Sequence, residues 1–119
     1  MENLFRVVSG AELAAAVGLG MLPRCPSDER SNCVHLNFRS DVEAVASLYF
    51  SPEEAPVALE IRRPDIEEGL AFAPPTEAKP FRQATLARPN ILLSWVVAVH
   101  PLDVVQCNGV AAFRFAAGA

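Results

Sequence analysis

The chain has 119 residues, of which 51% are hydrophobic and 20% charged, and its formal net charge at neutral pH is -4. This size predicts one domain, spanning residues 1–119, with enough apolar side chains for a core. The acidic balance argues against a protein that binds a nucleic-acid backbone, because such proteins need clustered Lys and Arg. We therefore expect no nucleic-acid partner.

The sequence predicts no association with a membrane. Its longest apolar run, residues 91–99, is about half of what a membrane span requires, and the first residues lack the basic and apolar segments of a signal peptide. The chain has three cysteines, an odd count for a disulfide scaffold. We therefore expect a reduced, cytoplasmic protein.

The N-terminal part alternates strands and helices. Residues 4–8 form a β-type run, and the spacing of Ser9 and Glu12 is that of a capping box, which predicts a helix over 10–17. Prolines and alternating charges over 23–32 indicate a loop. A strand around His35 follows.

A second helix is predicted over residues 41–50. Ser40 and Glu43 have the spacing of another capping box, and apolar residues follow at helical spacing as far as Tyr49. This helix would place Tyr49, like the apolar residues before it, on a face packed against a sheet.

The second half is interpreted mainly as strands, over residues 57–61, 70–72, 83–87, 91–99 and 110–115. The run 91–99 is apolar on both faces, as in a central strand covered on both sides. Three prolines in 73–80 predict an irregular, mobile flap. We expect 110–115 at a sheet edge, where pairing with a second copy would give a homodimer, followed by a flexible small-residue tail from about residue 116. The order of elements predicts an α+β fold of small mixed or antiparallel sheets with two short N-terminal helices.

The strand 33–38 presents the leading candidate for a site. Alternate side chains point to opposite faces, so one face is wholly apolar and the other carries Cys33, His35 and Asn37. An imidazole titrates near neutral pH and can act as acid, base or hydrogen-bond partner. The alternative for His35 is a polar strand residue whose ring nitrogens bond only to the backbone.

Other polar residues are interpreted as structural. His100 ends a buried strand, and no histidine, cysteine or carboxylate cluster has the spacing of a metal site, so we expect no metal. The carboxylate pairs are expected to be solvated in exposed turns: Asp28-Glu29, Glu53-Glu54 and Glu67-Glu68.

Several segments resemble the opening of the small bacterial family called domain of unknown function 952: Leu4–Ser9, Ala11–Leu13, Gly20, Asp28 and Cys33–Asn37. The family pattern is an aromatic strand, a short helix with Glu-Trp or Glu-Leu, a Gly, and then Gly-Phe-Ile-His-Leu/Cys-Ser. The resemblance covers about four-fifths of the chain and is more specific in its first half. The family is grouped with the ADP-ribosyltransferase-like folds, whose members bind NAD or a related nucleotide in a cleft between two small sheets.

The departures from this pattern define the expected function. The family's Trp-Glu pair is Phe72-Ala73 here, and Gln83 stands where the family has a histidine, whereas His35 is unchanged. We therefore predict a non-catalytic or degenerate member that binds a nucleotide or another small ligand. The alternatives are a small transferase acting on an NAD-like nucleotide through His35, Arg6 and Gln83, and a protein-interaction module.

The predicted ligand-binding residues are Arg6, His35, Asn37 and Gln83, and His35 is also the candidate catalytic residue. The resemblance implies that they line one cleft although they lie far apart in the sequence. Arg6 would supply a fixed positive charge for a phosphate or carboxylate, because guanidinium binds such groups bidentately. The segment 74–80 would border this cleft.

Overall fold

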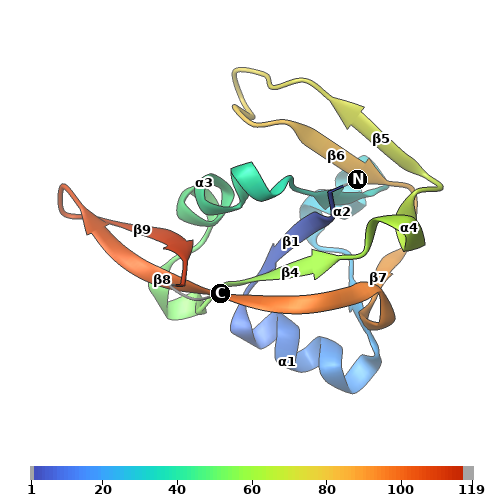
Figure 1. Ribbon diagram of the computed structural model, residues 1–119, viewed down its shortest axis with the longest axis horizontal. Coiled ribbons are helices and arrows are strands. Elements are labelled where there is room, and N and C mark those ends of the chain that lie inside the picture. Colours follow the sequence, from blue (N-terminus) through green and yellow to red (C-terminus); the bar gives the residue numbers. More distant parts are fainter. Residues whose placement is uncertain (1, 117–119) are drawn as a thin grey trace.

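The computed structural model describes residues 2–116 of the chain (Figure 1). Apart from Ala116, the predicted tail lies outside the described residues. The strands are β1 (Leu4–Val8), β2 (Met21–Pro23), β3 (Val34–Leu36), β4 (Val57–Ile61), β5 (Leu70–Ala73), β6 (Gln83–Leu86), β7 (Asn90–Leu92), β8 (Val96–Cys107) and β9 (Val110–Phe115). The α-helices are α1 (Gly10–Leu19), α2 (Pro26–Ser31), α3 (Arg39–Tyr49) and α4 (Arg63–Ile66). The architecture is therefore α+β, as predicted.

The strands form three antiparallel sheets. A four-stranded sheet in the order β1-β4-β8-β9 runs across the molecule, a three-stranded sheet has the order β3-β6-β5, and β2 pairs with β7 (Figure 1). The first two sheets meet where Phe5 of β1 bridges Asn37, just after β3, through two hydrogen bonds of 2.7 Å. This bridge brings the strand that carries His35 beside the strand that carries Arg6.

All five residues of β1 are buried because the strand lies between two cores. Leu4 and Val8 pack on one side with residues of α1, β3 and β6. Phe5 and Val7 pack on the other side against α3 and Phe113 of β9. Since alternate side chains face opposite ways, Arg6 lies on the same face as Leu4 and Val8 and is enclosed with them.

The first capping box is present as predicted. The Oγ of Ser9 accepts a hydrogen bond from the backbone N–H of Glu12 at 3.0 Å, and the Glu12 carboxylate accepts from the backbone N–H of Ser9 at 2.9 Å. The helix ends at Gly20, whose φ of 77° is a left-handed conformation that glycine adopts without steric cost.

Two of the connecting segments contain short helices. The loop prediction for 23–32 is wrong because α2 begins there: Pro26 holds the first helical position, and the carboxylate of Asp28 accepts from the backbone N–H of Cys25 at 3.0 Å. The connection after β4 likewise contains α4, again with a proline in its first turn.

The second helix starts earlier than its capping box predicts. Phe38 is the extended residue before α3, and Ser40 lies inside the helix, where its hydroxyl accepts from Arg82 at 3.3 Å. Three apolar residues of its predicted face, Val42, Val45 and Ala46, are buried, whereas Tyr49 is 54% exposed. Tyr49 therefore does not belong to the core.

The prediction of one central strand over 91–99 is also wrong. A turn of 3-10 helix over Leu93–Trp95 separates β7 from β8, and the two strands belong to different sheets. Along β8 the alternate residues Val97 and Val99 are 51% and 47% exposed. The segment is therefore apolar on both faces because its two ends belong to different sheets, and because one face of β8 is partly exposed.

The predicted terminal strand forms the edge of the four-stranded sheet as β9. The backbone N–H of Phe113 donates to Ser47 Oγ at 2.9 Å, and that of Phe115 donates to Glu43 Oε2 at 2.7 Å. Two backbone N–H groups of this edge are therefore bonded to α3. A homodimer through β9 stays a prediction, and it would have to form through the other backbone groups of the strand. Within residues 2–116 no helix is long and apolar enough to cross a membrane.

Candidate functional site

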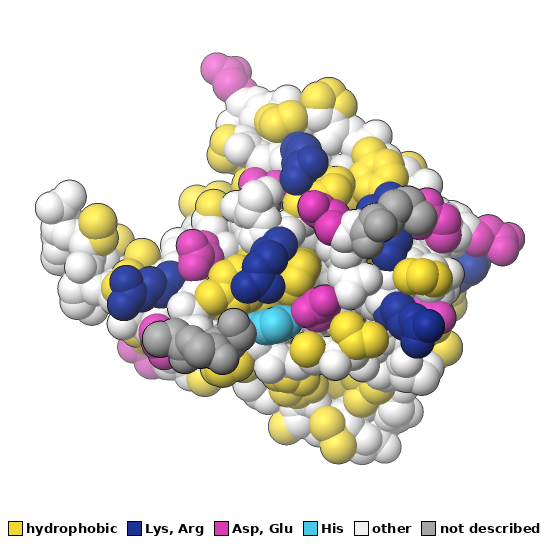
Figure 2. Space-filling model, in the orientation of Figure 1, with side chains coloured by type: hydrophobic (Ala, Val, Ile, Leu, Met, Phe, Trp, Pro, Cys, Tyr) yellow, Lys and Arg dark blue, Asp and Glu magenta, His cyan; other side chains and the backbone are white. Residues whose placement is uncertain are grey.

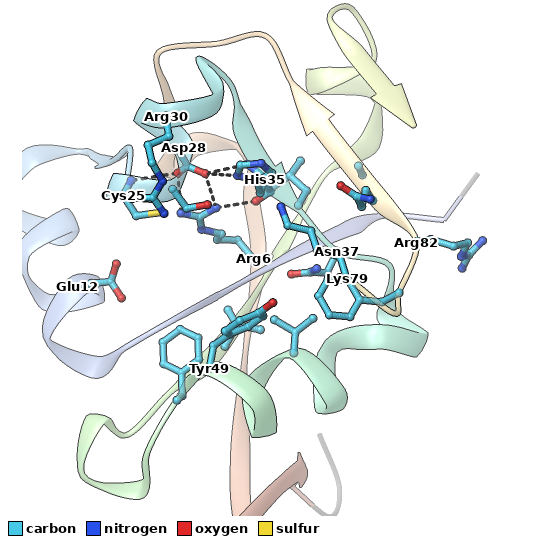
Figure 3. Close-up of a pocket in the computed structure, with 18 of the residues that line it drawn as sticks. Arg6, Glu12, Cys25, Asp28, Arg30, His35, Asn37, Tyr49, Lys79 and Arg82 are labelled. Carbon is cyan, nitrogen blue, oxygen red and sulfur yellow. Dashed lines mark hydrogen bonds and ion pairs between the residues drawn. The ribbon is translucent and has the colours of Figure 1, made fainter. Parts of the chain in front are cut away.

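The site is built around Asp28, whose side chain is fully buried. Arg6 of β1 donates to both of its carboxylate oxygens, at 3.2 and 2.7 Å. His35 of β3 contacts Oδ1 twice, through its backbone N–H at 3.0 Å and its ring Nδ1 at 2.8 Å. With the backbone N–H of Cys25, these groups surround the carboxylate in Figure 3.

The hydrogen bonds keep Asp28 ionised. Burial alone would raise the pKa of Asp28, but the hydrogen bonds from His35 and Arg6 and the charge of Arg6 hold that pKa well below its usual range. An ionised carboxylate only accepts hydrogen bonds. The proton between Asp28 and His35 therefore belongs to Nδ1 of the histidine.

Arg6 is brought to the site but not for the role predicted from the sequence. Its guanidinium is buried, and besides Asp28 it donates to the backbone oxygen of His35 at 2.6 Å. Burial alone would lower the pKa of Arg6, but hydrogen bonding to Asp28 and its charge outweigh this effect and raise it. Three of its five N–H donors are thus bonded inside the protein, so Arg6 positions Asp28 and His35.

A cavity of about 570 Å³ adjoins this group (Figure 3). The predicted residues Arg6, His35, Asn37 and Gln83 all line it. The ring of His35 is 23% exposed, and within residues 2–116 no protein group is hydrogen-bonded to its Nε2. The structure thus brings the four residues to one hollow, with one ring nitrogen of His35 free for a ligand.

The opposite part of the cavity is largely apolar and aromatic. Val45, Tyr49 and Phe50 come from α3 and the residue after it, and Phe81 comes from the segment before β6. The rings of Tyr49 and Phe81 lie edge to face, with centroids 6.3 Å apart. Such an apolar wall with few polar groups is typical of small-molecule sites.

The amide residues have different surroundings. Asn37 is held through its backbone by the bridge to Phe5, and its side chain lines the cavity. The Gln83 side chain donates to the backbone oxygen of Pro74 over 3.4 Å, a long contact. The segment 74–80 borders the cavity, as predicted, through Lys79.

Charges of both signs line the rim of the cavity. The basic residues are Arg30, Lys79 and Arg82, and the acidic ones are Glu12 and Glu54. On the face shown in Figure 2 the Lys and Arg side chains are interspersed with Asp and Glu and form no basic stripe. This distribution differs from the clustered positive charge with which proteins bind phosphate backbones.

The second histidine lies outside the cavity in a separate pair. Nε2 of His100 is 2.7 Å from Glu60, whose other oxygen accepts from Asn3, also at 2.7 Å. The bonds from Asn3 and His100 lower the pKa of Glu60. In residues 2–116 no group of three or more His, Cys, Asp and Glu is arranged to hold a metal, and Cys25, Cys33 and Cys107 are free thiols.

The sequence interpretation missed the central residue of the site. Asp28 was expected to be solvated in a turn, yet it is fully buried. The available signal was local: a proline at Pro26 with an acid two residues later is typical of a helix start. Such a signal predicts the cap but not the contacts of Asp28 with Arg6 and His35, which come from other elements.

The fold resembles solved structures of protein CC0527 from Caulobacter crescentus. Its crystal structure matches with a TM-score of 0.74 and 23% sequence identity, over 92% of each chain. Its solution structure matches with a TM-score of 0.71 and 24% identity, over 92% of this chain and 91% of the other. No family model matches the chain, and no curated protein does. At these identities the likeness establishes a shared fold.

Proposed function

We propose that this chain is a small-ligand-binding domain whose ligand lies in the cavity and contacts His35. One observation carries the proposal: Asp28 holds the ring of His35 at Nδ1, while Nε2 faces a cavity of about 570 Å³ with no hydrogen-bond partner among residues 2–116. A fixed polar group in a largely apolar hollow of this volume is the usual design of a ligand site.

The site supports binding better than catalysis. The Asp28 carboxylate is bonded to Arg6 and His35, and Arg6 donates three hydrogen bonds to Asp28 and His35, so both residues are engaged in positioning the ring of His35. Of the four predicted binding residues, His35, Asn37 and Gln83 remain as polar contacts for a ligand. This reduced set is consistent with a degenerate member of the family called domain of unknown function 952, which makes an NAD-like nucleotide the first ligand to test.

A transferase acting on such a nucleotide is the second candidate function. The contact of 2.8 Å between Asp28 and Nδ1 of His35 favours it, because a carboxylate that orients an imidazole is a common general-base arrangement. In that case Nε2 would take a proton from the acceptor molecule, whose oxygen or nitrogen bonds to the ribose carbon as the bond from that carbon to nicotinamide breaks and nicotinamide leaves. Turnover of the bound nucleotide distinguishes this candidate from simple binding.

The test is thermal unfolding with a panel of NAD, ADP-ribose, AMP and nicotinamide. A ligand at about 100 times its Kd adds about 2.7 kcal/mol to the free energy of unfolding. We expect at least one compound to raise the Tm of the wild type and of His100→Gln, and to have little effect on His35→Leu. Each variant is compared with its own ligand-free form.

NMR of the backbone amides then locates the binding site. Shifts that cluster on β3, β6 and the end of α3 support the proposal. Shifts outside the cavity, or an equal rise in Tm for His35→Leu, contradict it. Absence of any effect, together with capture of a protein partner through the exposed apolar surface, would favour the interaction-module alternative.

A further inference from the structure

We infer that the ligand of this cavity presents a hydrogen-bond donor, a hydroxyl or an N–H group, to Nε2 of His35. The inference rests on the proposed function and names the chemical class of the ligand group that His35 selects. It differs from the sequence-based expectation, in which an anionic phosphate or carboxylate occupied this end of the site.

The first step is the tautomer of His35. Asp28 accepts from Arg6 twice and from the backbone N–H groups of Cys25 and His35, and its Oδ1 lies 2.8 Å from Nδ1 of the His35 ring. An ionised carboxylate has no proton to give, so Nδ1 carries the hydrogen. In the neutral imidazole the other nitrogen, Nε2, then has a lone pair and accepts.

The second step concerns charge at this wall. Asp28 and Arg6 form a buried ion pair at 2.7 Å, whose charges compensate each other. The charge of Arg6 is therefore compensated at the wall beside His35, and the other charges that line the cavity, Arg30, Lys79 and Arg82 with Glu12 and Glu54, are of both signs. The lone pair of Nε2 repels an acceptor. A neutral donor group gives Nε2 a hydrogen bond, without repulsion from its lone pair and without burying an anion.

The third step is the shape of the remaining cavity. Across the cavity from His35, Phe81 and Tyr49 form an aromatic wall, and Tyr49 is about half exposed there. A planar ring packs on such a wall and brings its own substituent toward His35. Small aromatic compounds that differ in one substituent are therefore suitable probes.

The experiment compares phenol with anisole, and benzamide with N,N-dimethylbenzamide, by NMR titration in alkaline buffer, in which imidazole is neutral. Each pair shares its ring, and only the first member has a donor. Benzoate serves as an acceptor-only probe. We expect each donor to bind about fivefold more tightly than its methylated partner, the effect of one net hydrogen bond, and benzoate to bind least.

Variants assign this preference to His35. His35→Leu removes the acceptor and should bring the ratio of phenol to anisole affinity close to one, whereas the control His100→Gln should keep it. In Asp28→Asn the amide can donate to Nδ1, which moves the ring hydrogen to Nε2. That variant should prefer benzoate to phenol.

The tautomer can be measured even if Asp28→Asn does not fold. Long-range proton–nitrogen spectra of the wild type should show the hydrogen on Nδ1 of His35, and a hydrogen on Nε2 would overturn the inference. Binding of anisole or benzoate as tight as that of phenol would overturn it too, while leaving the proposed function intact. If neither these probes nor the nucleotides affect the cavity, the proposed function itself fails.

Discussion

Replacement of Asp28 by asparagine should strongly destabilise the protein. The substitution preserves side-chain volume, so it creates no cavity and mainly removes a charge. Arg6, only 8% exposed, would then be a buried cation without its partner. Breaking one half of a buried ion pair typically costs about 3–5 kcal/mol, a large part of the stability of a domain of this size.

Urea unfolding followed by circular dichroism measures this loss. With a slope of about 1.5 kcal/mol per molar, the midpoint should fall by about 2–3 M. The control is Glu67→Gln, which removes one partner of the pair with Arg63; the Glu67 side chain is 48% exposed, so about 0.5 kcal/mol or less is expected.

The double variant Arg6→Met/Asp28→Leu separates a buried unpaired charge from a general loss of packing. It should be more stable than Asp28→Asn, because it leaves no charge uncompensated. The reasoning is refuted if Asp28→Asn loses less than about 1 kcal/mol, or if the double variant is the less stable of the two.

Three further predictions concern pH, a helix end and assembly. Because the pKa of Asp28 is lowered, below about pH 4 the unfolded chain binds a proton at Asp28 that the folded chain does not. The free energy of unfolding of the wild type should therefore fall below that pH, and its difference from that of Asp28→Asn should narrow. Urea midpoints measured across the acidic range test this. Gly20→Ala forces alanine into a left-handed conformation at φ 77° and should lower the free energy of unfolding by about 1 kcal/mol. Gly18→Ala lies inside α1 with open space around it and should raise the free energy of unfolding by about 0.5–1 kcal/mol. Equal Tm changes in the two variants would contradict this. Light scattering tests the homodimer through β9: a mass of two chains supports it, and a mass of one chain at high concentration excludes it.

Local patterns in the sequence were sufficient for much of the secondary structure. The capping box at Ser9 predicts α1 because both of its hydrogen bonds form within four residues. The alternation around His35 predicts two apolar neighbours on one face and the histidine on the other, and in β3 the neighbours are buried and His35 is partly exposed. Both predictions depend only on residues close together in the chain.

Tertiary structure decided the features that depend on distant segments. The apolar run 91–99 belongs to two strands because its first part pairs with β2 and its last with β4. Tyr49 follows the apolar period of α3, yet it lines the cavity and is 54% exposed. The strands that pair with 91–99 and the segments that form the cavity beside Tyr49 are not indicated by the residues next to them in the sequence.

The same distinction holds for the site. The sequence indicated His35 and Asn37 as polar residues on one face of a strand, and the resemblance added Arg6 and Gln83. The sequence alone did not show that Asp28 would be buried, because the burial of a carboxylate depends on the groups that compensate its charge. Arg6 lies 22 residues before it and His35 seven residues after it, and only the folding of β1 and β3 around α2 brings them within hydrogen-bonding distance.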